Sequence, residues 1–361
     1  MFSSDDHRFM AQALRLAERG LYSASPNPRV GCVIVREGQV VGEGWHERAG
    51  TPHAEIHALQ QAGERMRGAT VYVTLEPCSH HGRTPPCADA LIAADVARVV
   101  AAMRDPNPQV AGQGMARLAR TGIQVEVGLM EQQALEMNIG FVSRMTRGRP
   151  WVRLKAAASL DGKTALNNGV SKWITGSAAR ADVQHWRARS CAILTGVGTV
   201  LADDPQMNVR EIETTRQPLR VIVDSRLTTP PSAKILAGGN ALIVCATDDA
   251  AKTQALRSAG AEVLVLAGRD GRVDLARLLQ LLAEREVNEL MIEAGATLNG
   301  ALLNAGLVDE LVLYLAPVLM GDAARGLFAL PALQQMDQRK ILAVQDVRLV
   351  GQDIRVMARV S

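Results

Sequence analysis

Aromatic side chains are scarce in this chain of 361 residues, where Phe, Trp and Tyr together make up only 3% of the sequence. So low a content argues against a surface that stacks the bases of single-stranded nucleic acid. An excess of one charge is missing as well, because 40 Lys and Arg stand against 37 Asp and Glu without a long single-sign run. Such a balance provides little affinity for a nucleic-acid backbone, so we expect no nucleic-acid partner.

Long hydrophobic runs are also absent, and the apolar stretches are much shorter than a membrane span. Residues 1–6 are polar and acidic, without the apolar segment of a signal peptide behind them. Only five cysteines occur. Three of them, Cys32, Cys191 and Cys245, lie in apolar, strand-like stretches, which is typical of buried free thiols. We therefore expect no membrane partner and a reducing, cytoplasmic location.

The length of the chain predicts two domains, since single hydrophobic cores stop growing below this size. A basic, irregular segment at residues 144–150 separates them, so we place the domains at residues 1–146 and 147–361. Hydrophobic periodicity and turn residues predict the elements of the first half. They are helices at about 4–20, 53–64, 87–94 and one ending near 120, a hairpin of 30–35 and 40–45, and strands at 70–75, 96–102 and 123–127.

The second half again alternates strands and helices. Strands are predicted at 151–157, 192–195, 219–224, 241–245, 263–266, 290–293, 310–318 and 353–360, and helices near 177–189, 275–286 and 297–307. This alternation predicts two α/β domains, the first with three layers.

One constellation in the first half specifies chemistry. His53, Cys78 and Cys87 offer one imidazole and two thiolates, three ligands that leave a fourth zinc position open for water, as in catalytic zinc sites. Together with Glu55 and Pro77 they match the H-x-E…P-C-x-x-C signature of zinc-dependent base deaminases, except that eight residues separate the cysteines. Both segments follow strands, near helix starts that stabilise thiolates.

The glutamate of this motif is placed to move protons. Zinc lowers the pKa of a bound water, and Glu55 would take the proton of that water and deliver it to the departing ammonia. On a regular helix His53 and Glu55 lie about 200° apart, so both cannot face one metal from the middle of a helix. We therefore expect His53 at the first turn, behind Pro52, where its side chain can leave the helical path.

Two other interpretations stay open at this point. The zinc could be structural and closed by His80 or His81 as fourth ligand, although Glu55 would then have no role. The residues could also be unrelated core and loop positions. His57 lies four residues after His53, but a protease zinc motif needs Glu directly after the first His. We therefore interpret His57 as a packing residue or as one that supports the metal ligands from behind.

The segment between the cysteines, residues 79–86, carries two imidazoles, Arg83 and hydroxyl groups on a backbone stiffened by Gly and Pro. Such groups beside a metal suit an anionic, phosphate-bearing substrate. The alternative is a solvated loop without a particular role.

Three motifs carry a close family resemblance: Asn27-Pro28-Arg29-Val30-Gly31, His53-Ala54-Glu55 and Thr74-Leu75-Glu76-Pro77-Cys78-Ser79-His80 with Thr84-Pro85-Pro86-Cys87. They resemble the bifunctional riboflavin-biosynthesis deaminase–reductases, and the resemblance extends over essentially the whole chain. It implies a cytidine-deaminase-like first domain with zinc on His53, Cys78 and Cys87 and with Glu55 as the proton shuttle. It also implies substrate contacts from Asn27, His46, His80 and Arg83, where Lys is common in the family and either cation can meet a phosphate.

Taken alone, the second half is less specific. It contains no G-x-G-x-x-G fingerprint with an acidic residue at the right distance, which disfavours a Rossmann domain. The segment from Gly295 to Gly300 does run from a strand into a helix, where backbone N–H groups can meet a phosphate.

The resemblance implies a dihydrofolate-reductase-like second domain that uses NADPH. The implied cofactor residues are Ala157, Trp173, Thr199, Asp203, Ser225, Gly295, Ala296, Thr297, Leu298, Asn299, Gly300 and Ala301. The implied substrate residues are Ser171, Arg187, Met207, Arg210 and Glu293.

The proton donor of the reduction stays open between Lys155 and Glu293. Asp161 is interpreted as a structural turn residue, and Asp203-Asp204 before Pro205 as a helix-terminating turn.

The resemblance implies a two-step enzyme that deaminates a phosphoribosylated diaminopyrimidine and then reduces the ribosyl group of the resulting aminouracil to ribityl. One rival is a zinc deaminase of tRNA or free cytidine with an accessory nucleotide-binding domain, and another is a binding protein with a structural zinc. Family resemblance also implies a homo-oligomer, most simply a dimer.

Overall fold

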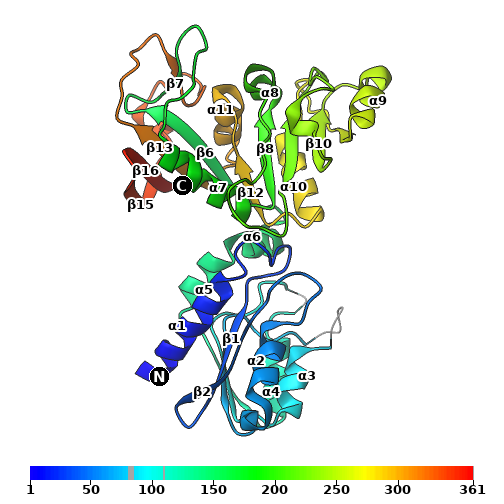
Figure 1. Cartoon of the computed structure of the whole chain (residues 1–361), viewed down its shortest axis with the longest axis vertical. Coiled ribbons are helices and arrows are strands. Elements are labelled where there is room, and N and C mark those ends of the chain that lie inside the picture. Colours follow the sequence, from blue (N-terminus) through cyan, green and yellow to red (C-terminus); the bar gives the residue numbers. More distant parts are fainter. Residues whose placement is uncertain (80–84, 109, 361) are drawn as a thin grey trace. The chain divides into compact units, whose positions relative to one another are not determined.

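The computed structural model describes residues 1–79, 85–108 and 110–360 (Figure 1). It divides the chain into two compact units, Met1–Gly148 and Arg149–Ser361. All five cysteines are free. Within the described ranges, every helix is too short or too polar to span a lipid bilayer.

The first unit is a three-layer α/β sandwich around a five-stranded sheet of order β2-β1-β3-β4-β5. The helices α1 and α5 cover one face, and α2, α3 and α4 cover the other (Figure 1). Strand β1 is antiparallel to β2 and β3, whereas β3, β4 and β5 are parallel. The strands are β1 (Gly31–Arg36), β2 (Gln39–Trp45), β3 (Thr70–Val73), β4 (Arg98–Ala101) and β5 (Gln124–Val127). The helices are α1 (Ser4–Glu18), α2 (Ala54–Ala62), η1 (Gly63–Met66), α3 (Cys87–Ala93), α4 (Gln113–Arg120), α5 (Glu131–Met137) and α6 (Ile139–Arg147).

Glycines on β2 let helix α2 lie directly on the backbone of the sheet. A Cβ atom on Gly42 would stand 2.1 Å from the carbonyl oxygen of Ala58, and one on Gly44 would stand 2.3 Å from that of Ala54. No side chain fits in so little space, so these positions require glycine. The close approach fixes the start of α2, which carries the histidine and glutamate of the metal motif.

The second unit is built on a nine-stranded sheet of order β11-β10-β9-β8-β12-β6-β13-β16-β15, parallel except for β16 and β15. Helices α10 and α11 pack on one face, and α7, α8 and α9 pack on the other. The nine strands of this sheet are β6 (Trp151–Ser159), β8 (Ala192–Gly196), β9 (Leu219–Val223), β10 (Ala241–Cys245), β11 (Ala261–Val265), β12 (Glu289–Ile292), β13 (Glu310–Ala316), β15 (Leu342–Val350) and β16 (Asp353–Val360). A separate antiparallel pair is formed by β7 (Lys163–Ala165) and β14 (Arg325–Gly326). The helices are α7 (Ser177–Arg189), α8 (Val197–Asp203), η2 (Lys234–Leu236), α9 (Ala250–Ser258), α10 (Leu275–Glu284), α11 (Ala296–Asn304) and η3 (Met336–Gln338).

The prediction of two α/β domains is confirmed, but the irregular segment expected at residues 144–150 is partly wrong. Helix α6 continues to Arg147 and ends at Gly148, whose φ of 64° is the left-handed C-cap conformation that glycine adopts readily. Arg144 and Arg147 lie in the last turn, where cations favour the helix dipole, so the basic composition belongs to a helix end. Helices α5, α6, α8 and α9 and strands β7, β14 and β15 were not predicted.

Asp6 joins the first helix to the sheet of the first unit. It is buried, and it accepts hydrogen bonds from Tyr72 Oη at 2.7 Å and from Arg98 Nη1 at 2.7 Å. With Ser3 it also forms a capping box at the start of α1. The Arg98 guanidinium holds the pKa of this carboxyl far below its usual range, while burial opposes the shift.

Replacing Asp6 with Asn should lower the free energy of unfolding of the first unit by about 2–3 kcal/mol, because a buried charge-assisted network loses its acceptor. Hydrogen exchange of the α1 and β3 amides measures the loss. Exposed Asp5, which pairs with Arg8 on the surface, is the control, and Asp5→Asn should change stability by less than about 1 kcal/mol.

The ion pair between Asp6 and Arg98 predicts that the stability of the first unit depends on pH. The folded pKa of Asp6 is depressed, so its contribution is present above the unfolded value of about 4 and is lost as the pH falls below it. The difference in stability between wild type and Asp6→Asn should therefore shrink under acid. Equal exchange rates in both proteins at neutral pH would contradict this account.

Candidate active sites

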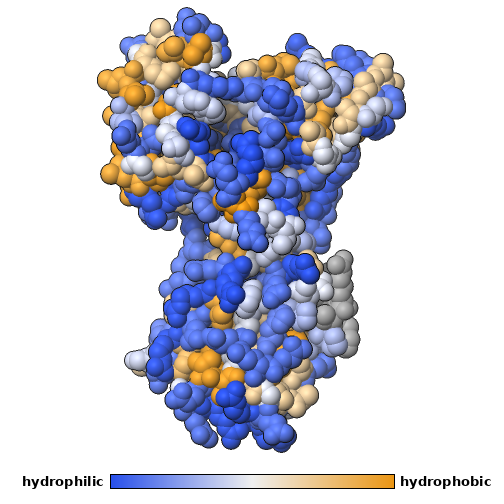
Figure 2. Space-filling model, in the orientation of Figure 1, coloured by the Kyte–Doolittle hydropathy of each residue, from blue (hydrophilic) through white to orange (hydrophobic). Residues whose placement is uncertain are grey.

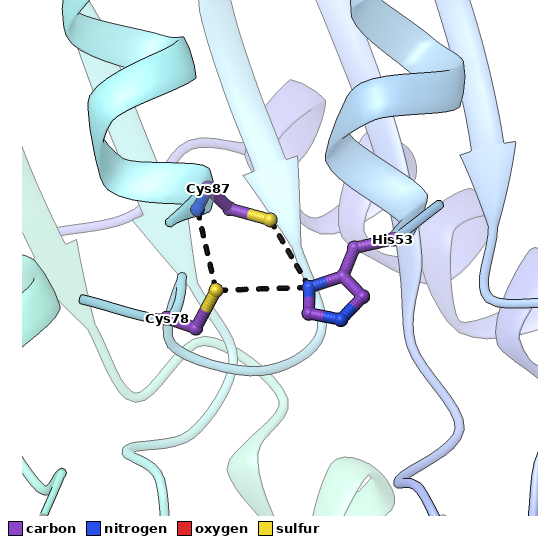
Figure 3. Close-up of side chains that lie close together, drawn as sticks. All are labelled: His53, Cys78 and Cys87. Atoms are coloured by element: carbon purple, nitrogen blue, oxygen red, sulfur yellow. Dashed lines mark hydrogen bonds between the residues drawn. The ribbon is translucent and has the colours of Figure 1, made fainter. Parts of the chain in front are cut away.

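Three side chains that could bind a metal ion converge at the starts of two helices in the first unit (Figure 3). His53 is the N-cap of α2, with extended backbone angles of −75° and 165°, and Cys87 is the first residue of α3. Cys78 follows β3 by a short segment. The helix wheel predicts that His53 lies off the regular helix, and its N-cap position confirms this prediction.

The geometry of these ligands fits a tetrahedral zinc ion. His53 Nδ1 lies 3.2 Å from Cys87 Sγ and 3.6 Å from Cys78 Sγ, and all three ligand atoms lie within 4.8 Å of one another. Zinc–sulfur and zinc–nitrogen bonds at tetrahedral angles place sulfur and nitrogen about 3.6 Å apart. Among the described residues this is the one such His, Cys, Asp or Glu cluster, and it supplies three ligands. His80 and His81, the candidate fourth ligands, lie outside the described residues.

The two cysteine thiols differ in their pKa. A hydrogen bond from the Cys87 thiol lowers the pKa of Cys78, and His53 and the Cys87 amide, which lies 3.2 Å from Cys78 Sγ, act in the same direction. The same contact, together with burial, raises the pKa of Cys87. One thiolate thus exists before any cation binds, in a position to attract one.

Glu55 lies beside these ligands and is almost completely buried, with 3% of its surface exposed. Burial raises its pKa to about 7, although the neighbouring His53 opposes the shift. No salt-bridge partner for this carboxylate occurs in the described part of the chain, which is unusual for a buried acid and typical of a catalytic one. His57 contacts Gly44 of β2, which agrees with a packing role.

Two implied substrate residues are hydrogen-bonded to each other. Asn27 Nδ2 lies 3.0 Å from His46 Nε2, and His46 Nδ1 lies 3.3 Å from the carbonyl oxygen of Pro52. The His46 ring meets the His53 ring edge to face at 5.4 Å. Burial lowers the pKa of His46, so its imidazole is held neutral. The other two implied residues, His80 and Arg83, lie outside the described residues.

A cluster of charged, partly buried side chains marks the second unit. Lys155 is on β6 and Glu293 directly follows β12, so parallel neighbours bring them together. Arg187 of α7 makes a two-pronged contact with Glu293, at 2.6 Å and 3.0 Å, and Lys155 Nζ lies 3.9 Å from the same carboxylate.

Further implied substrate residues surround this cluster. Arg187 also donates to the carbonyl oxygen of Asn208 at 3.1 Å and lies 3.9 Å from Met207 Sδ. Arg210 is exposed, and it lowers the pKa of Glu293 through its charge. Ser171 is partly exposed on the loop after β7.

The implied cofactor residues lie at the carboxyl ends of β8, β9 and β12 and on neighbouring segments. Gly295 is the N-cap of α11 and Gly196 that of α8, and Leu298 packs against Gly196. Trp173 is 72% exposed, with the Arg180 guanidinium 4.6 Å from the centre of its ring. The remaining positions are Ala157 within β6, Thr199 and Asp203 within α8, Ser225 just after β9, and Ala296, Thr297, Asn299 and Ala301 within α11.

Some of these residues have packing roles of their own. A Cβ atom on Gly300 would stand 2.2 Å from the carbonyl oxygen of Ala329, so this glycine is needed where residues near Ala329 cross α11. Asp204 is the left-handed C-cap of α8, as expected of a helix-terminating turn. Asp161 accepts from the amides of Met320 and Gly321 at 3.0 Å and 2.8 Å, which agrees with a structural role.

Sequence reasoning missed Glu76. It is buried two residues before Cys78, and its carboxylate accepts hydrogen bonds from backbone amides of residues 105, 112, 114 and 115. An acidic residue inside an apolar strand end was the available signal. Its partners lie 29 to 39 residues away and could not be identified from local spacing.

Comparisons with known proteins cover both units. Residues 3–103 match the model of the cytidine and deoxycytidylate deaminase zinc-binding region, and residues 150–354 match that of the RibD C-terminal domain. Riboflavin biosynthesis protein RibD of Escherichia coli is 49% identical over 97% of this chain and 98% of its own length. The Haemophilus influenzae protein of the same name is 47% identical over 98% and 97%.

Solved structures similar to this chain come from the same family. Acinetobacter baumannii RibD, form 2, has 48% identity and a TM-score of 0.91, with 99% of both chains covered. A Thermotoga maritima diaminohydroxyphosphoribosylaminopyrimidine deaminase/5-amino-6-(5-phosphoribosylamino)uracil reductase has 32% identity and a TM-score of 0.88, again with 99% of both chains covered. Since these relatives match along both units, the second unit is not an unrelated accessory domain. The chain belongs to the RibD family of riboflavin-biosynthesis proteins, bifunctional enzymes with a deaminase and a reductase domain.

Proposed function

We propose that residues 1–146 catalyse the hydrolytic deamination of 2,5-diamino-6-(5-phosphoribosylamino)pyrimidin-4-one. Residues 147–361 then reduce the ribosyl group of 5-amino-6-(5-phosphoribosylamino)uracil to ribityl with NADPH. The printed activities of the Thermotoga relative support this choice of substrates. The observation that carries it is the buried Glu55 carboxyl beside His53, Cys78 and Cys87.

The deaminase residues divide the work by their chemistry. His53, Cys78 and Cys87 would hold a zinc ion, which supplies a water of lowered pKa when bound. Glu55 accepts a proton from the attacking water and gives it to the amino group that leaves as ammonia, so one water is consumed and a ring carbonyl forms. A pKa of about 7 lets this carboxyl take up and release protons near neutral pH. Asn27 and the neutral His46 would orient the pyrimidine ring.

Changing Glu55 to Gln should reduce the rate of ammonia release by at least about 100-fold, because the amide cannot carry the proton. Zinc content and NADPH-dependent reduction should persist, since no metal ligand or residue of the second unit changes. Glu64→Gln, an exposed position on η1, is the matched control and should retain full activity. Ammonia release by Glu55→Gln at the wild-type rate would exclude the proposed shuttle.

The buried charges of the second unit favour Lys155 as the proton donor of the reduction. Burial lowers the pKa of Lys155, although Glu293 opposes the shift. The pKa of Glu293 is lowered despite burial, because Arg187 and Lys155 stabilise its carboxylate. The ammonium group therefore gives up a proton more readily than usual, whereas Glu293 stays ionised. We infer that, as hydride reaches the anomeric carbon and the bond from this carbon to the ring oxygen breaks, Lys155 protonates the departing ring oxygen, and that Glu293 holds Lys155 in place.

Lys155→Met should reduce kcat for NADPH oxidation by about 100-fold or more with a smaller change in KM, because it removes a proton rather than a binding contact. The near-ultraviolet absorbance of NADPH follows the reaction, with the aminouracil as substrate. The exposed Lys234, changed to Met, is the control. A variant that lost affinity but kept kcat would show that Lys155 only binds substrate.

We also propose that a second copy of the chain covers β15, the edge strand of the nine-stranded sheet. A register shift between Val344 and Asp346 in the pairing with β16 keeps Leu342, Val344, Val347 and Leu349 on one face. All four are exposed, Leu349 by 72%. Hydrophobic residues gather on the surface in this region (Figure 2). Exposed edges are usually protected by charge, so an apolar edge favours a partner.

Val347→Asp should convert the wild-type dimer to a monomer, as measured by sedimentation at micromolar concentrations, because a buried carboxylate in the interface would lack a partner. Val40→Asp changes an exposed valine on β2 and should leave the dimer intact. A monomeric wild type, or a dimeric Val347→Asp protein, would refute the proposed interface.

A reducing compartment, the cytoplasm, suits this enzyme because two zinc-binding thiols must stay reduced.

A further inference from the structure

Glu76 is a buried carboxylate whose four hydrogen bonds all go to the backbone of one segment. Oε1 accepts from the amides of Gly114 at 2.9 Å and Met115 at 3.3 Å. Oε2 accepts from the amides of Gly112 at 2.9 Å and Asp105 at 3.2 Å. Four donors fill the accepting capacity of a carboxylate. Because these bonds are charge-assisted and lie at the start of α4, they hold this segment strongly.

The same segment is seated on the residue that precedes the metal ligand Cys78. A Cβ atom on Gly114 would stand 1.9 Å from the carbonyl oxygen of Pro77 and 3.3 Å from Cγ of Glu76. The first turn of α4 therefore presses directly on the Pro77 backbone. Gly112, with a φ of 79°, provides the left-handed residue that turns the chain into this position.

Helix α4 also reaches the residues around both thiol ligands. Arg117 Nη1 donates to the carbonyl oxygen of Ser79 at 3.3 Å, and Arg117 Nη2 pairs with Asp89 of α3 at 2.7 Å. The amide of Ala88, next to Cys87, donates to the carbonyl oxygen of Cys78 at 3.1 Å. Movement of α4 would thus shift both sulfurs relative to His53, which is held separately on α2.

We propose that Glu76 is a positioning residue of the deaminase. It fastens α4 and the segment after β4 against Pro77, and so sets the distance between the two cysteine sulfurs and His53. It touches neither the metal ligand atoms nor the proton shuttle, and it acts through the backbone of Cys78. The proposal rests on the assignment of His53, Cys78 and Cys87 as zinc ligands.

The test compares Glu76→Gln with wild type in the full-length chain. An amide group points N–H hydrogens at two of the four backbone donors, so two bonds are lost without a change in size. We expect zinc to be extracted by a chelator about 10–100-fold faster, and kcat for deamination to fall by a similar factor. The absorption bands of the cobalt-substituted protein should shift, because they report thiolate geometry. NADPH-dependent reduction in the same chain should be unchanged.

The matched control is Glu131→Gln, an exposed carboxylate at the start of α5, which should behave like wild type in all four measurements. If Glu76→Gln does not fold, Arg117→Met tests the attachment of α4 to the segments that carry the two cysteines. This variant should accelerate zinc extraction while preserving the fold. Wild-type extraction rates and cobalt spectra in Glu76→Gln, or in Arg117→Met where that variant replaces it, would overturn the proposal. A wild-type protein without zinc or deaminase activity would instead overturn the proposed function.

Discussion

The deaminase unit depends on one constraint. The imidazole nitrogen of His53 and the sulfurs of Cys78 and Cys87 must lie within bonding distance of one common point. Three separate packing solutions bring it about. Gly42 and Gly44 let α2 lie on the sheet and fix His53, while the start of α3 presents Cys87. Glu76 ties α4 to the chain before Cys78. Burying the polar groups of this site would cost free energy if they lacked hydrogen-bond partners. Their partners are backbone amides or the other metal-ligand side chains.

The two units handle buried charge in opposite ways. Among the described residues Glu55 pairs with no Lys or Arg, and burial raises its pKa to about 7 although the charge of His53 opposes the shift, so its proton becomes mobile at neutral pH. Glu293 is largely buried as well but meets Arg187 and Lys155, so it stays ionised, whereas burial lowers the pKa of Lys155. A buried carboxyl without an ion pair to Lys or Arg suits a residue that must take up and return a proton. A carboxylate in such an ion pair suits a residue that keeps its charge.

Much of this could be predicted from the sequence, because the decisive patterns are local. The zinc motif, the N-terminal position of His53, the helix at Ser177–Arg189 and the strand at Asp353–Val360 follow from short-range spacing. Strand β15 was missed because it is an exposed edge whose alternation is interrupted at Gln345. The cluster of Arg187 with Glu293 and the clamp of Glu76 join residues tens of positions apart, and only the tertiary fold brings them together.

X-ray absorption at the zinc edge of the active, full-length protein tests the central claim most directly. The account requires one zinc per chain with two sulfurs at about 2.3 Å, one imidazole nitrogen at about 2.0 Å and one oxygen from water as the fourth neighbour. Two imidazole ligands would mean that a second histidine closes the site, and would contradict a catalytic role. Active protein without zinc would contradict it as well.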